Sequence, residues 1–127
     1  MTLPDEYEQQ DRWRRFDEAL THVPLRPGER VLDLGCGVGA VTSQLARGGA
    51  EVIGVDVNEE VLARARALHP GVRFEHHDIG ALSPSTFGRV DGVWSSFVAA
   101  YFADLDAFVA RLRDVLTDGG WLALVEI

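Results

Sequence analysis

The stretch Val-Leu-Asp-Leu-Gly-Cys-Gly-Val-Gly, at residues 31–39, decides the fold. It begins as a short apolar run, typical of a buried β-strand, and ends in three glycines at alternating positions. Val38, Val41 and Leu45 then recur at helical spacing. The stretch therefore predicts a strand that runs through a glycine loop into a helix. At such a loop, free N–H groups and missing Cβ atoms let a ligand approach the backbone closely.

The chain on both sides of this loop continues as alternating strands and helices. A first helix is expected at about residues 6–21, with Asp5 as its cap, and residues 83–85 (Ser-Pro-Ser) are expected to form a loop. Because strands and helices alternate, the sequence predicts an α/β fold with a doubly wound parallel sheet covered on both faces. Strands are expected at residues 30–34, 51–55, 72–77, 90–95 and 121–127, and the later helices at about 38–47, 59–68 and 105–116.

Local signals add detail to this plan. Asn58 can cap the helix after the second strand. Residues 72–77 alternate between apolar and polar, which predicts a strand at the edge of the sheet. Residues 118–120 (Asp-Gly-Gly) predict a turn into the last strand. The buried face of the helix after Asn58 is expected to consist of Val61, Leu62, Ala65 and Leu68.

The composition excludes several kinds of partner. The formal net charge is −8 and all 12 basic residues are arginines. A nucleic-acid partner is not expected, because phosphate binding needs clustered basic side chains. Without lysine, a Schiff base and a Walker A site are excluded. The single cysteine, Cys36, fits a reducing cytoplasm. Neither a secretory signal, nor a membrane span, nor a metal site is expected.

The glycine loop fits two kinds of nucleoside ligand. Gly35-x-Gly37-x-x-Ala40 matches the dinucleotide fingerprint, with Asp56 near the position of its ribose-binding acid, which leaves an NAD-dependent oxidoreductase as one interpretation. Asp33, however, would repel a pyrophosphate by about 4 kcal/mol at 4 Å and moderate dielectric. A ligand with an ammonium and a sulfonium would instead be attracted. The alternative role for Asp33 is to cap the N–H groups of the loop.

Acidic residues also follow the second and third strands. Asp56 can accept hydrogen bonds from ribose hydroxyls, and Val57 beside it can pack on an adenine face. Asp78 is placed to accept a bond from the adenine amino group, with the N–H of Ile79 meeting a ring nitrogen. The alternative for Asp78 is a turn-forming residue. Acids at three successive strand ends favour one nucleoside site.

Together these segments resemble the class I S-adenosylmethionine-dependent methyltransferases. Residues 31–39 resemble the first motif of that family almost letter for letter. The resemblance covers about residues 28–127. It implies a Rossmann-like fold, S-adenosylmethionine as cofactor, and transfer of its methyl group to a small organic acceptor. Further matches to the family's ordered motifs lie at residues 52–56, 77–79, 90–95 and 116–121.

The resemblance also implies roles for residues at the strand ends. The loop with Asp33, Gly35, Cys36 and Gly37 would hold the methionine end of the cofactor, and Ser95 would lie beside that end through its backbone. The same resemblance assigns the ribose and the adenine to residues 56, 57, 78 and 79, in agreement with the reasoning from the strand ends.

The resemblance divides the chain into two parts. Residues 1–27 would form an N-terminal helix that acts as a lid, with Tyr7 and Trp13, and residues 28–127 would form the cofactor-binding core. The family sheet has seven strands, of which five are predicted here. We therefore expect a core that is truncated after the fifth strand. The alternatives are a second chain that completes the sheet, with this chain as a non-catalytic cofactor-binding subunit, or a homodimer.

Residues that would contact the acceptor give weaker signals. Phe97 and Tyr101 follow the fourth strand and could line an apolar acceptor pocket or belong to the core. No histidine is assigned as a catalytic base; His69 is expected at the C-terminus of a helix. Cys36 has two interpretations, a thiol whose pKa is lowered by a helix N-terminus or a small side chain packed under the loop.

Overall fold

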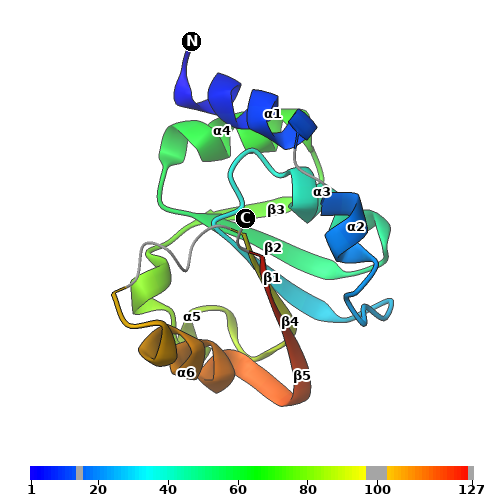
Figure 1. Ribbon diagram of the computed structural model, residues 1–127, viewed down its shortest axis with the longest axis vertical. Coiled ribbons are helices and arrows are strands. Elements are labelled where there is room, and N and C mark those ends of the chain that lie inside the picture. The colour runs from blue at the N-terminus through cyan, green and yellow to red at the C-terminus, as the bar shows by residue number, and fades with distance from the viewer. Residues whose placement is uncertain (14–15, 97–102, 126–127) are drawn as a thin grey trace.

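The computed structural model describes residues 1–13, 16–96 and 103–125, with only the backbone of residues 12 and 13. The described chain forms a five-stranded sheet in the order β3-β2-β1-β4-β5 (Figure 1). All neighbouring strands are parallel. The strands are β1 (Arg30–Leu34), β2 (Glu51–Asp56), β3 (Arg73–His76), β4 (Val90–Ser96) and β5 (Leu116–Val125).

The strand order places the point of reversal between β1 and β4. From β1 the chain proceeds outward through β2 to β3, and it then returns to the other side of β1 for β4 and β5. This arrangement confirms the predicted doubly wound fold and the edge position of β3. Ligands of such sheets bind beyond the carboxyl ends of the strands near the reversal, which is where β1 leads into the glycine loop.

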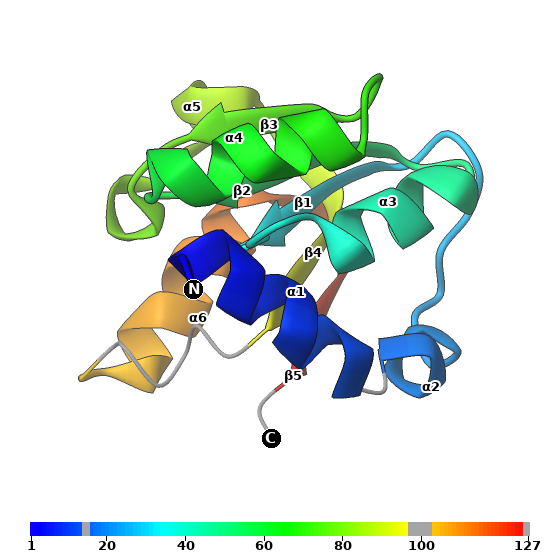
Figure 2. The same cartoon turned by 90° about the horizontal axis from the view of Figure 1, so that it is seen from above.

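Helices cover both faces of the sheet (Figures 1 and 2). Alternate residues of β1 pack in opposite directions: Val31 lies in the cluster with α3, and Leu32 lies in the cluster with α6. Phe74 of β3 packs with α4. The helices after β1 are α3 (Ala40–Arg47), α4 (Glu59–Leu68), the 3-10 turn η1 (Ile79–Ala81), α5 (Pro84–Phe87) and α6 (Leu105–Val115).

The N-terminal segment differs from the prediction of one helix. It forms α1 (Leu3–Trp13) and α2 (Phe16–Leu20), on either side of residues 14–15. The cap of α1 is Thr2 rather than Asp5. The Thr2 hydroxyl accepts a hydrogen bond from the Asp5 backbone N–H at 3.4 Å, and the Asp5 carboxylate accepts one from the Thr2 N–H at 3.0 Å. Asp5 therefore acts as the reciprocal acid of a capping box, one turn into the helix.

Two other local predictions are corrected and one is confirmed. Residues 83–85 do not form a loop, because Ser83 and Thr86 make a capping box that starts the short helix α5. Leu68, predicted on the buried face of α4, is 45% exposed at the last turn of that helix. Asn58 caps α4 as expected, since its side chain accepts a hydrogen bond from the Val61 N–H at 2.9 Å.

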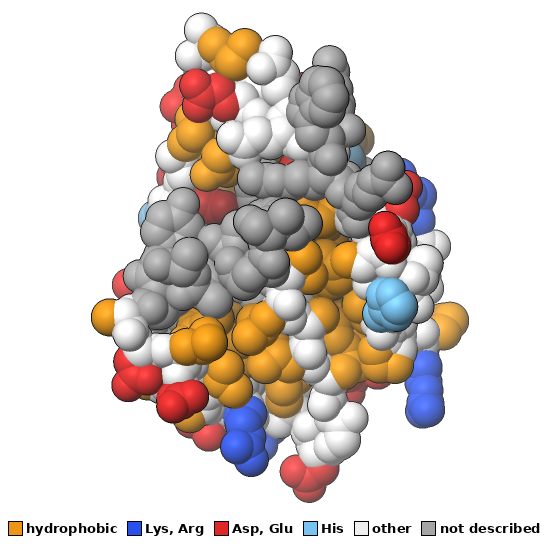
Figure 3. All heavy atoms as spheres, in the orientation of Figure 1, with side chains coloured by type: hydrophobic (Ala, Val, Ile, Leu, Met, Phe, Trp, Pro, Cys, Tyr) orange, Lys and Arg blue, Asp and Glu red, His pale blue; other side chains and the backbone are white. Residues whose placement is uncertain are grey.

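β5 is an edge strand with apolar side chains. The predicted turn at residues 118–120 is an irregularity within this strand, because Val90 pairs with Leu116 while Gly92 already pairs with Trp121. Residues 121–125 are half-buried and pack against the clusters on both faces of the sheet. Figure 3 shows hydrophobic side chains gathered on this side of the molecule. No described helix is long and apolar enough to cross a membrane.

Candidate functional site

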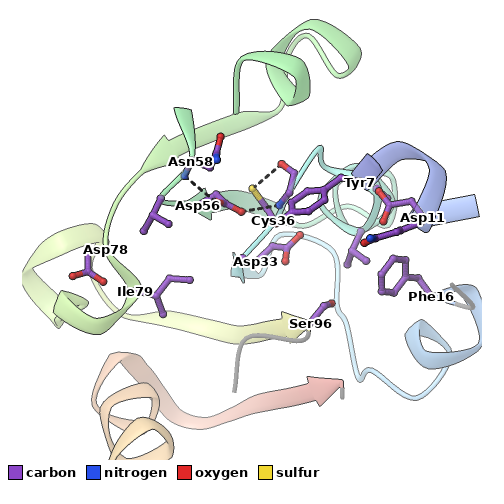
Figure 4. A pocket seen from close by; sticks show the side chains of 16 residues that line it. Tyr7, Asp11, Phe16, Asp33, Cys36, Asp56, Asn58, Asp78, Ile79 and Ser96 are labelled. Atoms are coloured by element: carbon purple, nitrogen blue, oxygen red, sulfur yellow. Dashed lines mark hydrogen bonds between the residues drawn. The ribbon is translucent and has the colours of Figure 1, made fainter. Parts of the chain in front are cut away.

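A cavity of about 620 Å³ lies at the carboxyl ends of the central strands, under α1 (Figure 4). Its lining combines the glycine loop, the strand-end acids and the N-terminal helices. The described residues that line it are Tyr7, Gln10, Asp11, Phe16, Asp33, Gly35, Cys36, Gly37, Ala40, Val41, Asp56, Val57, Asn58, Asp78, Ile79 and Ser96.

The glycine loop is fixed by hydrogen bonds to the end of β2. The backbone N–H groups of Gly35 and Cys36 both donate to the carbonyl of Val55, at 2.8 and 3.0 Å. The N–H of Gly37 donates to the Asp56 carboxylate at 3.0 Å. The positive φ of Gly35 and Gly37 lets the loop fold back in this way. The loop conformation therefore depends on a carboxylate of the neighbouring strand.

Asp33 is the buried acid of the site. It is 2% exposed, and its carboxylate accepts a hydrogen bond from the Thr42 hydroxyl of α3 at 2.7 Å. Burial raises the pKa of Asp33 to about 7; the Thr42 bond lowers this pKa, and the charges of Asp56 and Asp11 raise it. Asp33 does not cap the loop N–H groups, which was the alternative interpretation. Asp56 accepts from the loop instead.

Asp78 forms a local turn and also lines the cavity. Its carboxylate accepts a hydrogen bond from the Gly80 N–H at 2.9 Å and caps η1. This confirms the turn-forming role considered from the sequence, and that role leaves the residue facing the same space as Asp56. Val57 and Ile79 add apolar surface here. Val57 is 57% exposed, an unusual degree of exposure for valine.

α1 forms the cover of the cavity. A Cβ on Gly37 would lie 3.0 Å from the ring of Tyr7, so this helix packs directly on the glycine loop. Arg64 of α4 holds α1 by ion pairs with Asp5, at 3.0 Å, and with Glu8. The side chain of Trp13, predicted beside Tyr7, lies outside the described residues, as do Phe97 and Tyr101.

At the end of β4 the described lining of the cavity includes Ser96, whereas the role predicted for Ser95 was through its backbone. Ser95 is fully buried between its neighbours on β1 and β5, and its hydroxyl has no hydrogen-bond partner among the described residues. Ser96 accepts a hydrogen bond from the indole N–H of buried Trp94. Because an indole only donates, the proton of the Ser96 hydroxyl remains available to an acceptor in the cavity.

Several lining or supporting residues were not predicted from the sequence. Asp11 and Phe16 reach the site through the packing of α1 and α2, which local patterns do not specify. Thr42 could have been recognised from the sequence, because it is a polar residue beside Val41 on a helix that faces the core. A buried hydroxyl needs a partner, and this one bonds to a predicted site residue.

The structure also decides between the interpretations of Cys36. Burial, with the charges of Asp33 and Asp56, raises the pKa of this thiol well above its usual value. This direction argues against the interpretation of a lowered pKa, and the packing of Cys36 against the α4 cluster agrees with the other interpretation, a small side chain under the loop. No histidine is among the described lining residues. Within the described ranges, no cluster of His, Cys, Asp and Glu could hold a metal ion.

The described lining of the cavity is strongly acidic. It contains Asp11, Asp33, Asp56 and Asp78, and no arginine. Such a lining attracts cationic groups and disfavours a pyrophosphate, which needs basic side chains or free N–H groups. The arrangement also places the ends of four adjacent strands and a covering helix around one volume. The described lining of this pocket therefore suits a ligand with a positive charge.

Comparisons with known proteins place the chain in a family. Residues 32–124 match the methyltransferase domain family. Trans-aconitate 2-methyltransferase of Deinococcus radiodurans is 39% identical, over 95% of this chain and 47% of its own length. Malonyl-[acyl-carrier protein] O-methyltransferase of Enterobacter lignolyticus is 32% identical, over 90% of this chain and 45% of its own length. The chain thus spans less than half the length of these curated relatives.

Solved structures agree with this assignment. An S-adenosylmethionine-dependent methyltransferase from Mesorhizobium loti superposes with a TM-score of 0.76 at 30% identity, over 86% of this chain and 51% of that one. A Haloferax volcanii methyltransferase, solved in complex with the Trm112 methyltransferase activator, gives a TM-score of 0.77 at 28% identity, over 93% and 54% of the two chains. The chain described here belongs to the class I S-adenosylmethionine-dependent methyltransferases.

Proposed function

We propose that this chain forms the cofactor-binding part of a cytoplasmic enzyme that transfers a methyl group from S-adenosylmethionine to a small organic acceptor. The observation that carries the proposal is the acidic cavity beside the glycine loop, whose described lining has four aspartates and no arginine. The cofactor has an ammonium and a sulfonium, so its charge suits this lining. The relatives named for trans-aconitate and malonyl-[acyl-carrier protein] support a small or carrier-bound acceptor.

The residues at the loop fit the methionine end of this cofactor. Asp33 offers a buried carboxylate to the ammonium, and Gly35 and Gly37 leave room for the ligand at the backbone. Ser96 offers a hydroxyl proton, because its oxygen already accepts from Trp94. The donor and acceptor groups on this side of the cavity therefore match the two charged ends of an amino acid.

The residues at the ends of β2 and β3 fit the nucleoside. Asp56 accepts one hydrogen bond from Gly37 and one from the Asn58 N–H at 3.0 Å, and a carboxylate has further lone pairs for ribose hydroxyls. Val57 and Ile79 offer apolar surface to the adenine, with Asp78 as an acceptor at its edge. These assignments extend the strand-end reasoning to one continuous site.

The chain contributes orientation and exclusion of water to the reaction. When bound, S-adenosylmethionine supplies a methyl group already activated by a sulfonium. The protein must hold the acceptor in line with that methyl group and keep water out. α1 covers the cavity, and Tyr7 and Phe16 add aromatic surface to its lining. No described histidine lines the site, so we assign no catalytic base to this chain.

Two alternatives predict different ligands or partners. An NAD-dependent oxidoreductase would have to place a pyrophosphate among the aspartates, which opposes its charge. A cofactor-binding subunit would pair its exposed β5 edge with a second chain. The Haloferax neighbour was solved in complex with an activator protein, which supports a second chain as a possible partner. Native mass spectrometry of the intact protein distinguishes a single chain from a heteromeric complex and from a homodimer.

Calorimetric titration of the intact protein with S-adenosylmethionine, S-adenosylhomocysteine and NAD tests the proposed cofactor. We expect both sulfur compounds to bind and NAD not to bind. Asp33→Asn should weaken binding, whereas Asp114→Asn, on the exposed side of α6, is the matched control and should not. Absence of binding by either sulfur compound at about 1 mM, well above ordinary cofactor affinities, would reject the proposal.

A further inference from the structure

Thr42 is a buried polar residue whose partner lies in the cavity. Its side chain is fully buried in α3, on the side of that helix that packs against the sheet. A buried hydroxyl is costly unless it forms a hydrogen bond. Thr42 forms its bond with the carboxylate of Asp33, at 2.7 Å, instead of bonding back to its own helix. Its neighbour Ser43 shows the common alternative, because the Ser43 hydroxyl bonds to the carbonyl of Ala40.

The groups around Asp33 explain why this bond matters. Asp56 from β2 and Asp11 from α1 both place negative charge near the Asp33 carboxylate, and Cys36 lies in the adjoining loop. Tyr7 and Asp78 line the same cavity, while β4 contributes Ser96, which does not titrate in the accessible range. No arginine is among the described lining residues. Within the described part of the chain, the hydrogen bond from the Thr42 hydroxyl therefore stabilises the ionised form of Asp33.

Building on the proposed function, we propose that Thr42 is a positioning residue for ligand binding. Its hydroxyl holds one oxygen of the Asp33 carboxylate and leaves the other for the ammonium group of the cofactor. Thr42 does not line the cavity itself and acts through Asp33.

The affinity for a cationic ligand should depend on pH through Asp33. The pKa of Asp33 is about 7 with the Thr42 bond lowering it, so the carboxylate loses its charge as the pH falls through 7. A cationic ligand prefers the ionised form, and its affinity should fall on the acidic side. Without the Thr42 hydroxyl, the pKa of Asp33 rises further, and the affinity should already fall at a higher pH.

The test uses the intact protein with three substitutions in α3. Thr42→Val removes the hydroxyl at nearly constant volume, Thr42→Ser retains it, and Ser43→Ala removes a buried hydroxyl that does not touch the cavity. Dissociation constants for S-adenosylhomocysteine are measured by calorimetry between about pH 6 and pH 9. For Thr42→Val we expect a midpoint higher by about one pH unit, about five-fold weaker binding at pH 7, and recovery at pH 9.

The remaining variants and one ligand-free measurement complete the test. Thr42→Ser should return the midpoint to its wild-type value, and Ser43→Ala should not move it. If Thr42→Val weakens binding equally at every pH, or not at all, the role of Thr42 is structural and the inference is wrong. Carbon-13 NMR titration of the Asp33 carboxyl in the ligand-free protein measures its pKa directly and tests whether loss of the Thr42 hydroxyl raises that pKa. If the wild-type protein binds neither sulfur compound, the proposed function fails, whereas an unchanged Asp33 midpoint in Thr42→Val rejects the inference.

Discussion

The carboxylate of Asp56, at the end of β2, accepts a hydrogen bond at 3.0 Å from the backbone N–H of Gly37, 19 residues earlier in the chain. The same carboxylate accepts a second bond from the Asn58 N–H. One side chain thus joins the glycine loop to the start of α4. The loop that gives this family its first motif is held in shape by the acid of its second motif.

Replacing Asp56 by alanine should therefore affect both the fold and the site. The change removes two hydrogen bonds to a charged acceptor, which predicts a loss of about 2–4 kcal/mol in the free energy of unfolding. Binding of S-adenosylhomocysteine should weaken by more than the ten-fold expected for one lost ligand contact. Urea unfolding and calorimetry measure the two effects, with Asp114→Asn as control. Unchanged stability would show that the loop keeps its shape without Asp56.

Asp33→Asn should stabilise the ligand-free protein at alkaline pH. The pKa of Asp33 is about 7 in the folded protein, against about 3.9 in an unfolded chain, so the folded state binds the extra proton between these values. For this group, the free energy of unfolding falls as the pH rises from about 4 to about 7 and is level above that range. The Asp33→Asn variant has no carboxyl group to ionise at this position. It therefore avoids this fall in the free energy of unfolding, which amounts to a few kcal/mol.

Urea unfolding at about pH 5 and pH 8 checks this expectation, because the two values lie inside and above the range in which the folded protein holds the proton. The difference in stability between Asp33→Asn and wild type should grow toward pH 8, while Asp114→Asn should follow wild type at both values. A constant difference would mean that Asp33 is not the group that titrates. The variant that gains stability is also the one expected to lose affinity for the cofactor.

Arg64→Ala should loosen the cover of the cavity without unfolding the core. The guanidinium of Arg64 pairs with Asp5 and Glu8, and these ion pairs link α1 to α4. Because the pairs are partly exposed, we expect a loss of less than about 1 kcal/mol in global stability. Hydrogen exchange of the α1 amides should nevertheless become faster, since local opening costs less than global unfolding.

Arg66→Ala is the matched control for this prediction. Arg66 lies on the same helix and pairs with Glu59 of that helix. It should leave the exchange of α1 unchanged. Equal exchange rates of α1 in the Arg64 and Arg66 variants would show that aromatic and backbone packing, rather than the ion pairs, hold this helix on the site.

Gly92→Ala should strongly destabilise the sheet. A Cβ on Gly92 would lie 2.1 Å from a ring atom of Trp121, its partner residue on β5. Because the atoms in the way belong to a rigid indole ring and not to the end of a flexible side chain, we expect a loss of about 3 kcal/mol or more in urea unfolding. The double variant Gly92→Ala/Trp121→Leu should recover part of this loss. If the double variant is no more stable than Gly92→Ala alone, the clash with the Trp121 indole is not the cause of the destabilisation.

Periodicity predicted the sheet well because the signals of the strands are local. β1 was predicted at its observed bounds, and β2 to within one residue, since glycines and acids end both strands abruptly. The parts that were missed depend on contacts between distant segments. Asp11 and Phe16 reach the cavity only through the way α1 and α2 pack on the sheet. No pattern within residues 1–27 specifies that packing.

The two serines at the end of β4 illustrate a different limit. Successive residues of a strand point to opposite faces, so one position separates the buried side chain of Ser95 from Ser96, which lines the cavity. Ser95 and Ser96 are identical in type, and sequence alone offers no reason to prefer one of them. The acids at positions 33, 56 and 78 were easier to place, because each stands next to a strand end that hydrophobic periodicity locates.

The hydrogen bond from Trp94 to Ser96 also gives this protein an optical reporter. The indole of Trp94 is fully buried against Phe16, with ring centroids 6.4 Å apart, while its N–H reaches a hydroxyl that lines the cavity. Indole emission depends on the polarity and hydrogen bonding around the ring. A ligand that enters the cavity and engages Ser96 should therefore change the intrinsic fluorescence, and stopped-flow mixing could follow its arrival without a label.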